Sequence, residues 1–395
     1  MKIKLDHLGQ FYSAASDEKN PGTFCVGVTL KEPLDSEKLQ QAVNDLMKRL
    51  PHMNVRMHSG FFHYYNVAHE KPLMIEKENE HTEPCRHFEK GSHLLRVIYG
   101  KCNFTLEVLH SVCDGRSLAK VASALLIRYY ELMEISVNKD GFIDCSDIVH
   151  AEEMDDSYAR FADMRRAKLT KGEEAYMPKS EKTKAQIITQ KFDLATLKAG
   201  AQELGVTITE YIMAHICNEF AKQREKDGVE KGITCNIPID CRGFFPSRTL
   251  MSFVTHKIIK MPESANFAEM AQGIKKQFKG INLDYVQGKI SELEKWIRFG
   301  RFIPLFIKKW IIKGVGNSSL EGCSTWFSNL GLINLPKEVQ NKVDMLTFAL
   351  GPEAEMPYQF ACVTTGNTLT LMTTTTERDT TIIDRIGKAL VGRGA

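Results

Sequence analysis

The sequence predicts an α/β protein built from two similar halves. Segments with strand patterns alternate with segments whose apolar residues recur at helical spacing along the chain. The stretch FTLEVLHSVCDGRSLAKVASAL (104–125) also aligns without gaps with LTLMTTTTERDTTIIDRIGKAL (369–390), strand on strand and helix on helix. At 395 residues, 43% of them hydrophobic and 26% charged, the chain has an ordinary globular composition and can bury one large core or two medium ones.

The first half is predicted from short β-branched and aromatic runs separated by turn residues and helix signals. Asp35 or Ser36 can cap a helix that Pro51 ends, and Ser117 can cap a helix running to about residue 134. The predicted strands of this half are 5–12, 24–30, 55–57, 61–67, 94–99 and 104–109.

Dense charges over residues 137–181 predict a solvated crossover, which divides the chain into halves 1–178 and 179–395. In the second half, Thr207 and Glu210 have capping-box spacing, and helices are also expected after Asp193 and from residues 267 and 380. The predicted strands of this half are 185–192, 233–239, 252–259, 324–329, 345–350, 359–364 and 368–375.

Residues 296–315 (WIRFGRFIPLFIKKWIIKGV) are both apolar and basic. Because Pro304 interrupts the segment, we interpret it as a lid or a wall of the core. A helix lying on a membrane surface is the alternative.

Composition argues against several classes of function. The formal net charge of +3 is near neutral, which does not point to nucleic acid. The start of the sequence lacks the apolar core of a signal peptide, and no stretch approaches the roughly 20 apolar residues that span a bilayer, so a cytoplasmic protein is expected. Ten cysteines without a CxxC pair indicate reduced thiols, and histidines 58, 63, 69, 81, 87 and 93 lack metal-ligand spacing, so no metal is expected.

His110 lies at the end of a predicted strand, which is a suitable place for a reactive imidazole. Side chains alternate faces in a strand, so His110 ends an apolar row formed by Phe104, Leu106 and Val108. Asp114 and Gly115 then predict a turn, with Gly115 supplying backbone angles that a side chain would forbid.

His110-xxx-Asp114-Gly115, between a strand and an apolar helix, resembles the HxxxDG motif of the chloramphenicol acetyltransferase-like superfamily, which includes condensation domains and alcohol acetyltransferases. Many members carry HHxxxDG and use the second histidine. Here Leu109 takes the first place and His110 the second. The resemblance implies two α+β two-layer sandwich halves that form a pseudo-dimer, with a tunnel between them, and His110 as the catalytic residue.

The resemblance extends to two further segments. Asn236-Ile-Pro-Ile-Asp240-Cys-Arg242 is similar to the segment whose arginine pairs with the motif aspartate, so Arg242 is expected to hold Asp114, with a solvated turn as the alternative. Ser328-Asn329-Leu-Gly331 resembles the SNxG strand beside the active site, which makes Ser328 and Asn329 candidates for stabilising an oxyanion. Ordinary turn chemistry is the alternative there.

Other nucleophiles fit poorly. Cys113 adjoins Asp114 and is expected to face away from His110, and Ser111 is next to His110 in sequence, which is poor geometry for a serine–histidine bond. The sequence has neither a GxSxG elbow nor a GxxxxGK[ST] phosphate loop.

The resemblance implies an acyltransferase without a resident cofactor. His110 would act as general base while an acyl group, acetyl in the simplest case, passes from coenzyme A as co-substrate to a small alcohol or amine. A condensation-type enzyme with a donor on an acyl carrier protein is one alternative. A non-catalytic binding protein that kept the fold is the other.

Overall fold

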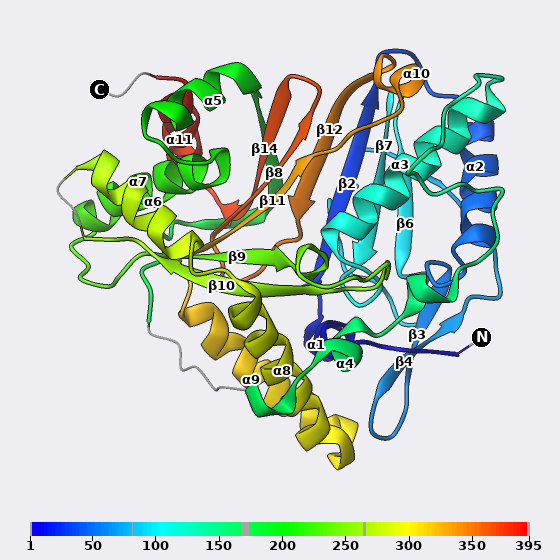
Figure 1. The fold of residues 1–395 in the computed structure, drawn as a ribbon, viewed down its shortest axis with the longest axis horizontal. Helices are drawn as coiled ribbons and strands as arrows, with labels where there is room; N and C mark the ends of the chain where they lie inside the picture. The colour runs from blue at the N-terminus through cyan, green and yellow to red at the C-terminus, as the bar shows by residue number, and fades with distance from the viewer. Residues whose placement is uncertain (1, 81, 167–173, 264–265, 393–395) are drawn as a thin grey trace.

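Two large mixed sheets, each covered by helices, lie side by side in the molecule (Figure 1). The computed structural model describes residues 2–80, 82–166, 174–263 and 266–392. The first large sheet has the strand order β12-β2-β7-β6-β5, and α3 packs against β2 and β7, with α2 against α3. Its elements are β2 (Thr23–Leu30), α2 (Ser36–Arg49), β5 (Glu76–Lys77), β6 (Leu95–Tyr99), β7 (Asn103–Leu109), α3 (Gly115–Leu132) and β12 (Val343–Leu350).

The second large sheet has the order β10-β9-β11-β13-β14-β8, and the helices α5, α6, α7 and α11 pack beside it. Thr207 caps α6 through the expected capping box with Glu210. The elements are β8 (Lys182–Asp193), α5 (Leu194–Glu203), α6 (Ile208–Lys226), β9 (Thr234–Asp240), β10 (Val254–Lys260), α7 (Phe267–Phe278), β11 (Thr325–Leu332), β13 (Tyr358–Thr365), β14 (Thr368–Glu377) and α11 (Thr381–Val391).

The repeated unit seen in the sequence is a strand–helix pair in both halves. β7 with α3 and β14 with α11 are those two units, and each strand has a neighbour on both sides in its sheet. Asp114 Oδ1 accepts the backbone N–H of Ser117 at 2.9 Å, and Asp379 Oδ1 accepts that of Thr381 at 2.9 Å. The two-halved α/β architecture is therefore confirmed.

One strand crosses between the halves. β12 belongs to the second half of the sequence but pairs antiparallel with β2 in the first sheet. Two threonines of β14, in the second sheet, donate hydrogen bonds to β12, in the first. Thr370 Oγ1 donates to the Leu346 carbonyl at 2.7 Å, and Thr374 Oγ1 donates to that of Leu350 at 2.6 Å. The two predicted halves are thus interlocked through β12.

The expectation of a strand at 5–12 is wrong. Asp6 accepts the backbone N–H of Gly9 at 2.7 Å and begins α1 (His7–Ala15), so this segment is helical. Leu5, Leu8, Phe11 and Tyr12 recur at helical spacing, and Asp6 supplies the cap, so the residues of this segment favour a helix. The correction matters because α1 carries residues that reach the site.

A small sheet and two helices form one edge of the molecule, the lower edge in Figure 1. The sheet has the order β1-β4-β3, and α9 packs against α1. Among the described residues, none of the helices has the length and apolar character needed to cross a membrane. The elements are β1 (Lys2–Lys4), β3 (Val55–Ser59), β4 (Tyr64–Ala68), α8 (Leu283–Phe299) and α9 (Leu305–Glu321). The described part of the predicted crossover contains α4 (Ser157–Phe161), and α10 (Lys337–Gln340) precedes β12.

We expect His52 to make the fold sensitive to acid. Its side chain is 3% exposed, both ring nitrogens lack a hydrogen-bond partner, and burial lowers its pKa to about 4 from 6.5. The unfolded chain therefore binds a proton first as the pH falls below 6.5, which destabilises the fold. His52→Leu should gain stability relative to the wild type by about 1.4 kcal/mol per pH unit between pH 6.5 and about 4, where the folded protein also binds the proton. Urea unfolding at several pH values measures this gain.

The exposed His58 provides the control for this prediction. His58→Leu should show no comparable gain at low pH. Equal pH dependence of the two variants would contradict the role assigned to His52.

Candidate active site

His110 follows directly after β7, and its main chain is held by both halves of the molecule. Its N–H donates to the carbonyl of Gly22 at 2.9 Å. Its carbonyl accepts the hydroxyl of Ser252 at 3.3 Å, from the segment that leads into β10. The histidine therefore stands at the junction of the two halves.

The imidazole lies among aromatic rings. The Tyr12 ring stacks on it, with centroids 4.3 Å apart and planes 4° apart, and the Phe24 ring meets it edge-on at 4.8 Å. The residue is partly buried, and Nδ1 is enclosed without a well-formed hydrogen bond. Burial lowers the pKa of His110, while contact with its own main chain and the charge of Asp114 oppose that shift. A neutral imidazole is the form that can accept a proton.

Asp114 is buried and accepts three hydrogen bonds around the loop that carries His110. Oδ1 accepts the N–H of Ser117, and Oδ2 accepts the N–H of Phe253 at 2.9 Å and Nη1 of Arg242 at 2.8 Å. Burial opposes ionisation, but Arg242 and the two backbone donors outweigh it and hold the pKa of Asp114 below its usual value. The carboxylate thus links the start of α3 to β10 in the other half.

Arg242, at the end of β9, is 9% exposed at its side chain and uses all five of its N–H groups. Such saturation fixes the guanidinium in one orientation and compensates the cost of burying its charge. Its acceptors are Asp114 Oδ2 at 2.8 Å, Asp240 Oδ1 at 3.0 Å, Ser117 Oγ at 3.0 Å and the carbonyls of Thr249 at 3.0 Å and Met251 at 2.7 Å. The contact with Asp114 that the resemblance implied is present, and the alternative of a solvated turn does not describe Arg242.

Two expectations about this loop are wrong: the residue that caps α3, and the reason for a glycine at position 115. Asp114, not Ser117, caps α3, while the Ser117 hydroxyl accepts from Arg242. Gly115 has no positive φ. Its hydrogen side chain suits close packing, because a Cβ would lie 3.0 Å from Phe348 Cζ and 3.1 Å from Leu330 Cδ2.

Sequence reasoning missed the contribution of α1 to the site. Asp6 is 1% exposed, and its Oδ2 accepts the N–H of Ser252 at 3.0 Å, the residue whose hydroxyl reaches the His110 carbonyl. Burial raises the pKa of Asp6 to about 8. The available signal was Asp6, a preferred N-cap residue, followed by Leu8 and Phe11–Tyr12 at helical spacing, and recognising it would have placed Tyr12 on a helix.

The two polar residues of the SNxG segment, Ser328 and Asn329, have different surroundings. Ser328 is buried on the face of β11 shared with Leu330, which reaches the Gly115 position. Asn329 donates to Thr209 Oγ1 at 3.0 Å and accepts the N–H of Gly331 at 2.7 Å. Gly331 has φ +72° within β11, where the register with β13 shifts between Asn329 and Leu332. Asn329 therefore supports a β-bulge, and Ser328 stays the candidate for lining the site.

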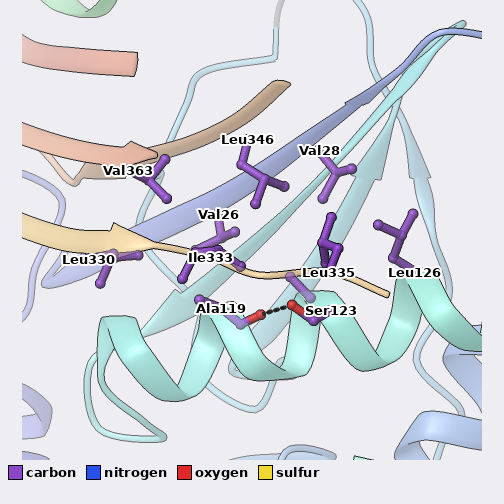
Figure 2. A pocket seen from close by; sticks show the side chains of 11 residues that line it. Val26, Val28, Ala119, Ser123, Leu126, Leu330, Ile333, Leu335, Leu346 and Val363 are labelled. Carbon is purple, nitrogen blue, oxygen red and sulfur yellow. Dashed lines mark hydrogen bonds between the residues drawn. The ribbon is translucent and has the colours of Figure 1, made fainter. Parts of the chain in front are cut away.

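One small cavity and one cleft lie beside the first large sheet. An enclosed apolar cavity of about 10 Å³ lies between α3 and the strands β2, β11, β12 and β13, with Val26, Ala119 and Leu346 on its wall (Figure 2). It is room for about one water molecule. A cleft of about 660 Å³ lies beside the start of α2. His110 lines neither of these two cavities.

Other reactive groups have a poorer setting. Cys113 is buried, which raises the pKa of its thiol well above the ordinary value and disfavours the thiolate. Among the residues that the structure describes, no group of three or more His, Cys, Asp and Glu side chains is arranged to hold a metal ion.

Comparisons with solved structures identify the fold. Neither a protein-family model nor a curated protein matches the sequence. The first condensation domain of the CDA synthetase is similar with a TM-score of 0.65 at 13% identity, over 100% of this chain and 97% of that one.

Two further structures agree. Polyketide synthase associated protein 5 from Mycobacterium tuberculosis is similar with a TM-score of 0.64 at 12% identity, over 98% of this chain and 97% of that chain. The epimerization domain from the third module of tyrocidine synthetase B has a TM-score of 0.64 at 9% identity, over 99% and 94% of the two chains. At these identities the likeness establishes the fold, which is that of condensation domains.

Proposed function

We propose that this protein is a condensation-type acyltransferase that moves an acyl group from a thioester to an alcohol or amine, with His110 as general base. The observation that carries the proposal is the partly buried imidazole fixed by its main chain where the halves meet, on a condensation-domain fold. Its lowered pKa keeps the imidazole neutral near pH 7, as a general base requires.

In the proposed reaction, neutral His110 takes the proton of the acceptor hydroxyl or amine as that atom attacks the thioester carbonyl. The C–O or C–N bond forms and the carbonyl becomes a tetrahedral oxyanion. Collapse of this intermediate breaks the C–S bond and expels the thiolate, which takes the proton back from His110. Direct transfer of this kind requires neither a metal nor a covalent acyl-enzyme.

Stabilising the oxyanion requires a hydrogen-bond donor aimed at it. Ser328 is our candidate, because it is buried on the face of β11 that leads to the start of α3. A backbone N–H of the loop after His110 is the alternative. Asp114, Gly115 and Arg242 are assigned a positioning role, since their contacts hold the loop and the start of α3.

The proposed reaction has two candidate donors. Similarity to condensation and epimerization domains of peptide synthetases favours an acyl or aminoacyl group carried by a separate carrier protein. Coenzyme A is the second candidate, on the resemblance of the His110-xxx-Asp114-Gly115 motif to that of alcohol acetyltransferases.

The test is to follow release of free thiol when purified protein is mixed with acetyl-CoA, or with acylated carrier protein, and a panel of alcohols and amines. Turnover with the carrier protein alone supports the condensation-type enzyme, and turnover with acetyl-CoA supports the second donor. His110→Ala, with either donor, should abolish the release. Tight binding of donor or acceptor without turnover would instead identify a non-catalytic binding protein.

The dependence of kcat/KM on pH should follow the protonation of the His110 imidazole. Because protonated His110 cannot accept a proton, kcat/KM should fall at low pH with a midpoint below 6.5, the ordinary histidine value. Tyr12→Leu removes the stacked ring and lessens burial, so its midpoint should move upward toward that value. A wild-type midpoint above 6.5 would contradict the assignment.

A further inference from the structure

One edge of the molecule exposes a concentration of large apolar side chains that the proposed reaction does not use. They come from the end of α8, the turn Gly300–Phe302, the start of α9 and the tip between β3 and β4. We call this surface the aromatic edge. Its most exposed members are Trp310 at 83%, Phe299 at 81%, Phe302 at 77%, Phe306 at 72% and Phe61 at 69%. Exposed apolar patches of this kind mark interaction surfaces.

Folding explains only one face of α9. Leu305 and Ile312 pack against the cluster of Leu5, Ala14 and Tyr64. Phe306 and Trp310, four residues apart, share a helix face and are almost fully exposed. A lid or core wall, our interpretation from the sequence, accounts for the packed face and leaves the exposed face without a role.

The aromatic edge is one connected surface. The Leu305 N–H donates to the carbonyl of Phe61 at 2.8 Å, and Lys308 Nζ donates to that of Phe62 at 2.7 Å. These bonds tie the start of α9 to the β3–β4 tip, and both segments reach the same lower edge in Figure 1. Side chains far apart in sequence are therefore presented together.

Positive charge accompanies the aromatic rings. Lys295, Arg298, Arg301 and Lys309 are exposed there, and residues 295–320 contain no Asp or Glu. Arg298 pairs with Glu294 just before this segment at 2.8 Å. The other three cations, Lys295, Arg301 and Lys309, alternate along the sequence with the aromatic residues. No acidic residue of the same segment neutralises them.

We propose that the aromatic edge binds the surface of a bilayer containing anionic lipids. Tryptophan and phenylalanine rings insert at the level of the headgroups, and neighbouring lysines and arginines attract anionic lipids. A second copy of the chain would bring the same cations against each other, which opposes self-association. Aromatic anchors of protein interfaces usually fill pockets, whereas these rings project from a turn, two helix ends and a hairpin tip, which suits a deformable lipid surface.

Vesicle flotation with the full chain tests the proposal. Binding to phosphatidylcholine vesicles should be weak, should become strong when phosphatidylserine is included, and should weaken with added salt. The double variant Phe302→Ser/Trp310→Ser should bind the anionic vesicles about tenfold less tightly. Arg301→Glu/Lys309→Glu should lose about tenfold on anionic vesicles and little on neutral ones.

Ile148→Ser is the matched control, because Ile148 is 72% exposed and lies outside the aromatic edge. It should bind like the wild type. Circular dichroism melting checks that every variant is folded, and none of these readouts depends on acyl transfer.

Tryptophan emission gives a second measurement. Of the three tryptophans, Trp296 and Trp310 lie on the aromatic edge, while Trp326 in β11 has a buried indole N–H. Anionic vesicles should shift the emission to shorter wavelength, and Trp296→Phe/Trp310→Phe should remove the shift. Absence of binding to both kinds of vesicle would overturn the proposal. So would a dimer, or a complex with an acidic carrier protein, that the aromatic-edge variants disrupt while no vesicle binds.

Discussion

His110→Ala should lower kcat for acyl transfer by about 10²–10⁴-fold, because a positioned general base contributes about that much to proton transfer. The substitution also removes the ring between Tyr12 and Phe24, so the free energy of unfolding should fall by about 1–3 kcal/mol while the protein stays folded. Initial rates of thiol release under saturating donor, together with urea unfolding, separate the two effects.

His215→Gln is the matched control for this experiment. His215 is also a buried histidine beside aromatic rings, Tyr211 and Phe267, but it lies on α6 and away from the candidate site. Its kcat should stay near the wild-type value. If His110→Ala kept kcat within a factor of about three of the wild type, His110 would not be the general base.

Arg242→Met should lower the free energy of unfolding by about 3–5 kcal/mol, which is the usual cost of leaving one member of a buried ion pair without its partner. The variant leaves the Asp114 carboxylate, 1% exposed, with only two backbone donors. The loop that carries His110 also loses its link to β9, so kcat should decrease as well. Urea unfolding at neutral pH measures the stability change.

Arg378→Met provides the comparison, because Arg378 and Glu181 form an ion pair of 2.7 Å whose side chains are 67% and 68% exposed. It should cost no more than about 1 kcal/mol. Adding Asp114→Asn to Arg242→Met should restore part of the lost stability, since the uncompensated charge is removed. A cost for Arg242→Met no greater than that for Arg378→Met would refute the role of the pair.

Local patterns predicted the central strand and helix of the site because their signals lie within a few residues of each other. Phe104, Leu106 and Val108 are buried in β7, and the apolar positions of α3 face the same core. The motif resemblance supplied what local patterns could not, namely that Arg242 lies against Asp114 although 128 residues separate them.

The failures have identifiable physical causes. The strand expected at residues 5–12 overlooked the helical spacing of Leu8 and Tyr12, and the cap at Asp6 begins the helix that brings Tyr12 onto His110. Gly115 was correctly singled out but for backbone freedom, whereas the reason is close packing against Phe348, a residue of the distant strand β12. Contacts of this kind depend on tertiary structure and leave no periodic signal in the chain.

The position of β12 has a consequence for synthesis on the ribosome. The edge of β2 that β12 covers stays open until residues 343–350 have left the exit tunnel, although the other strands of that sheet, β5, β6 and β7, have emerged long before. An unpaired edge strand invites association with other chains. A nascent chain of this protein therefore carries an exposed strand edge through most of its translation, and chaperone protection of that interval would favour its yield.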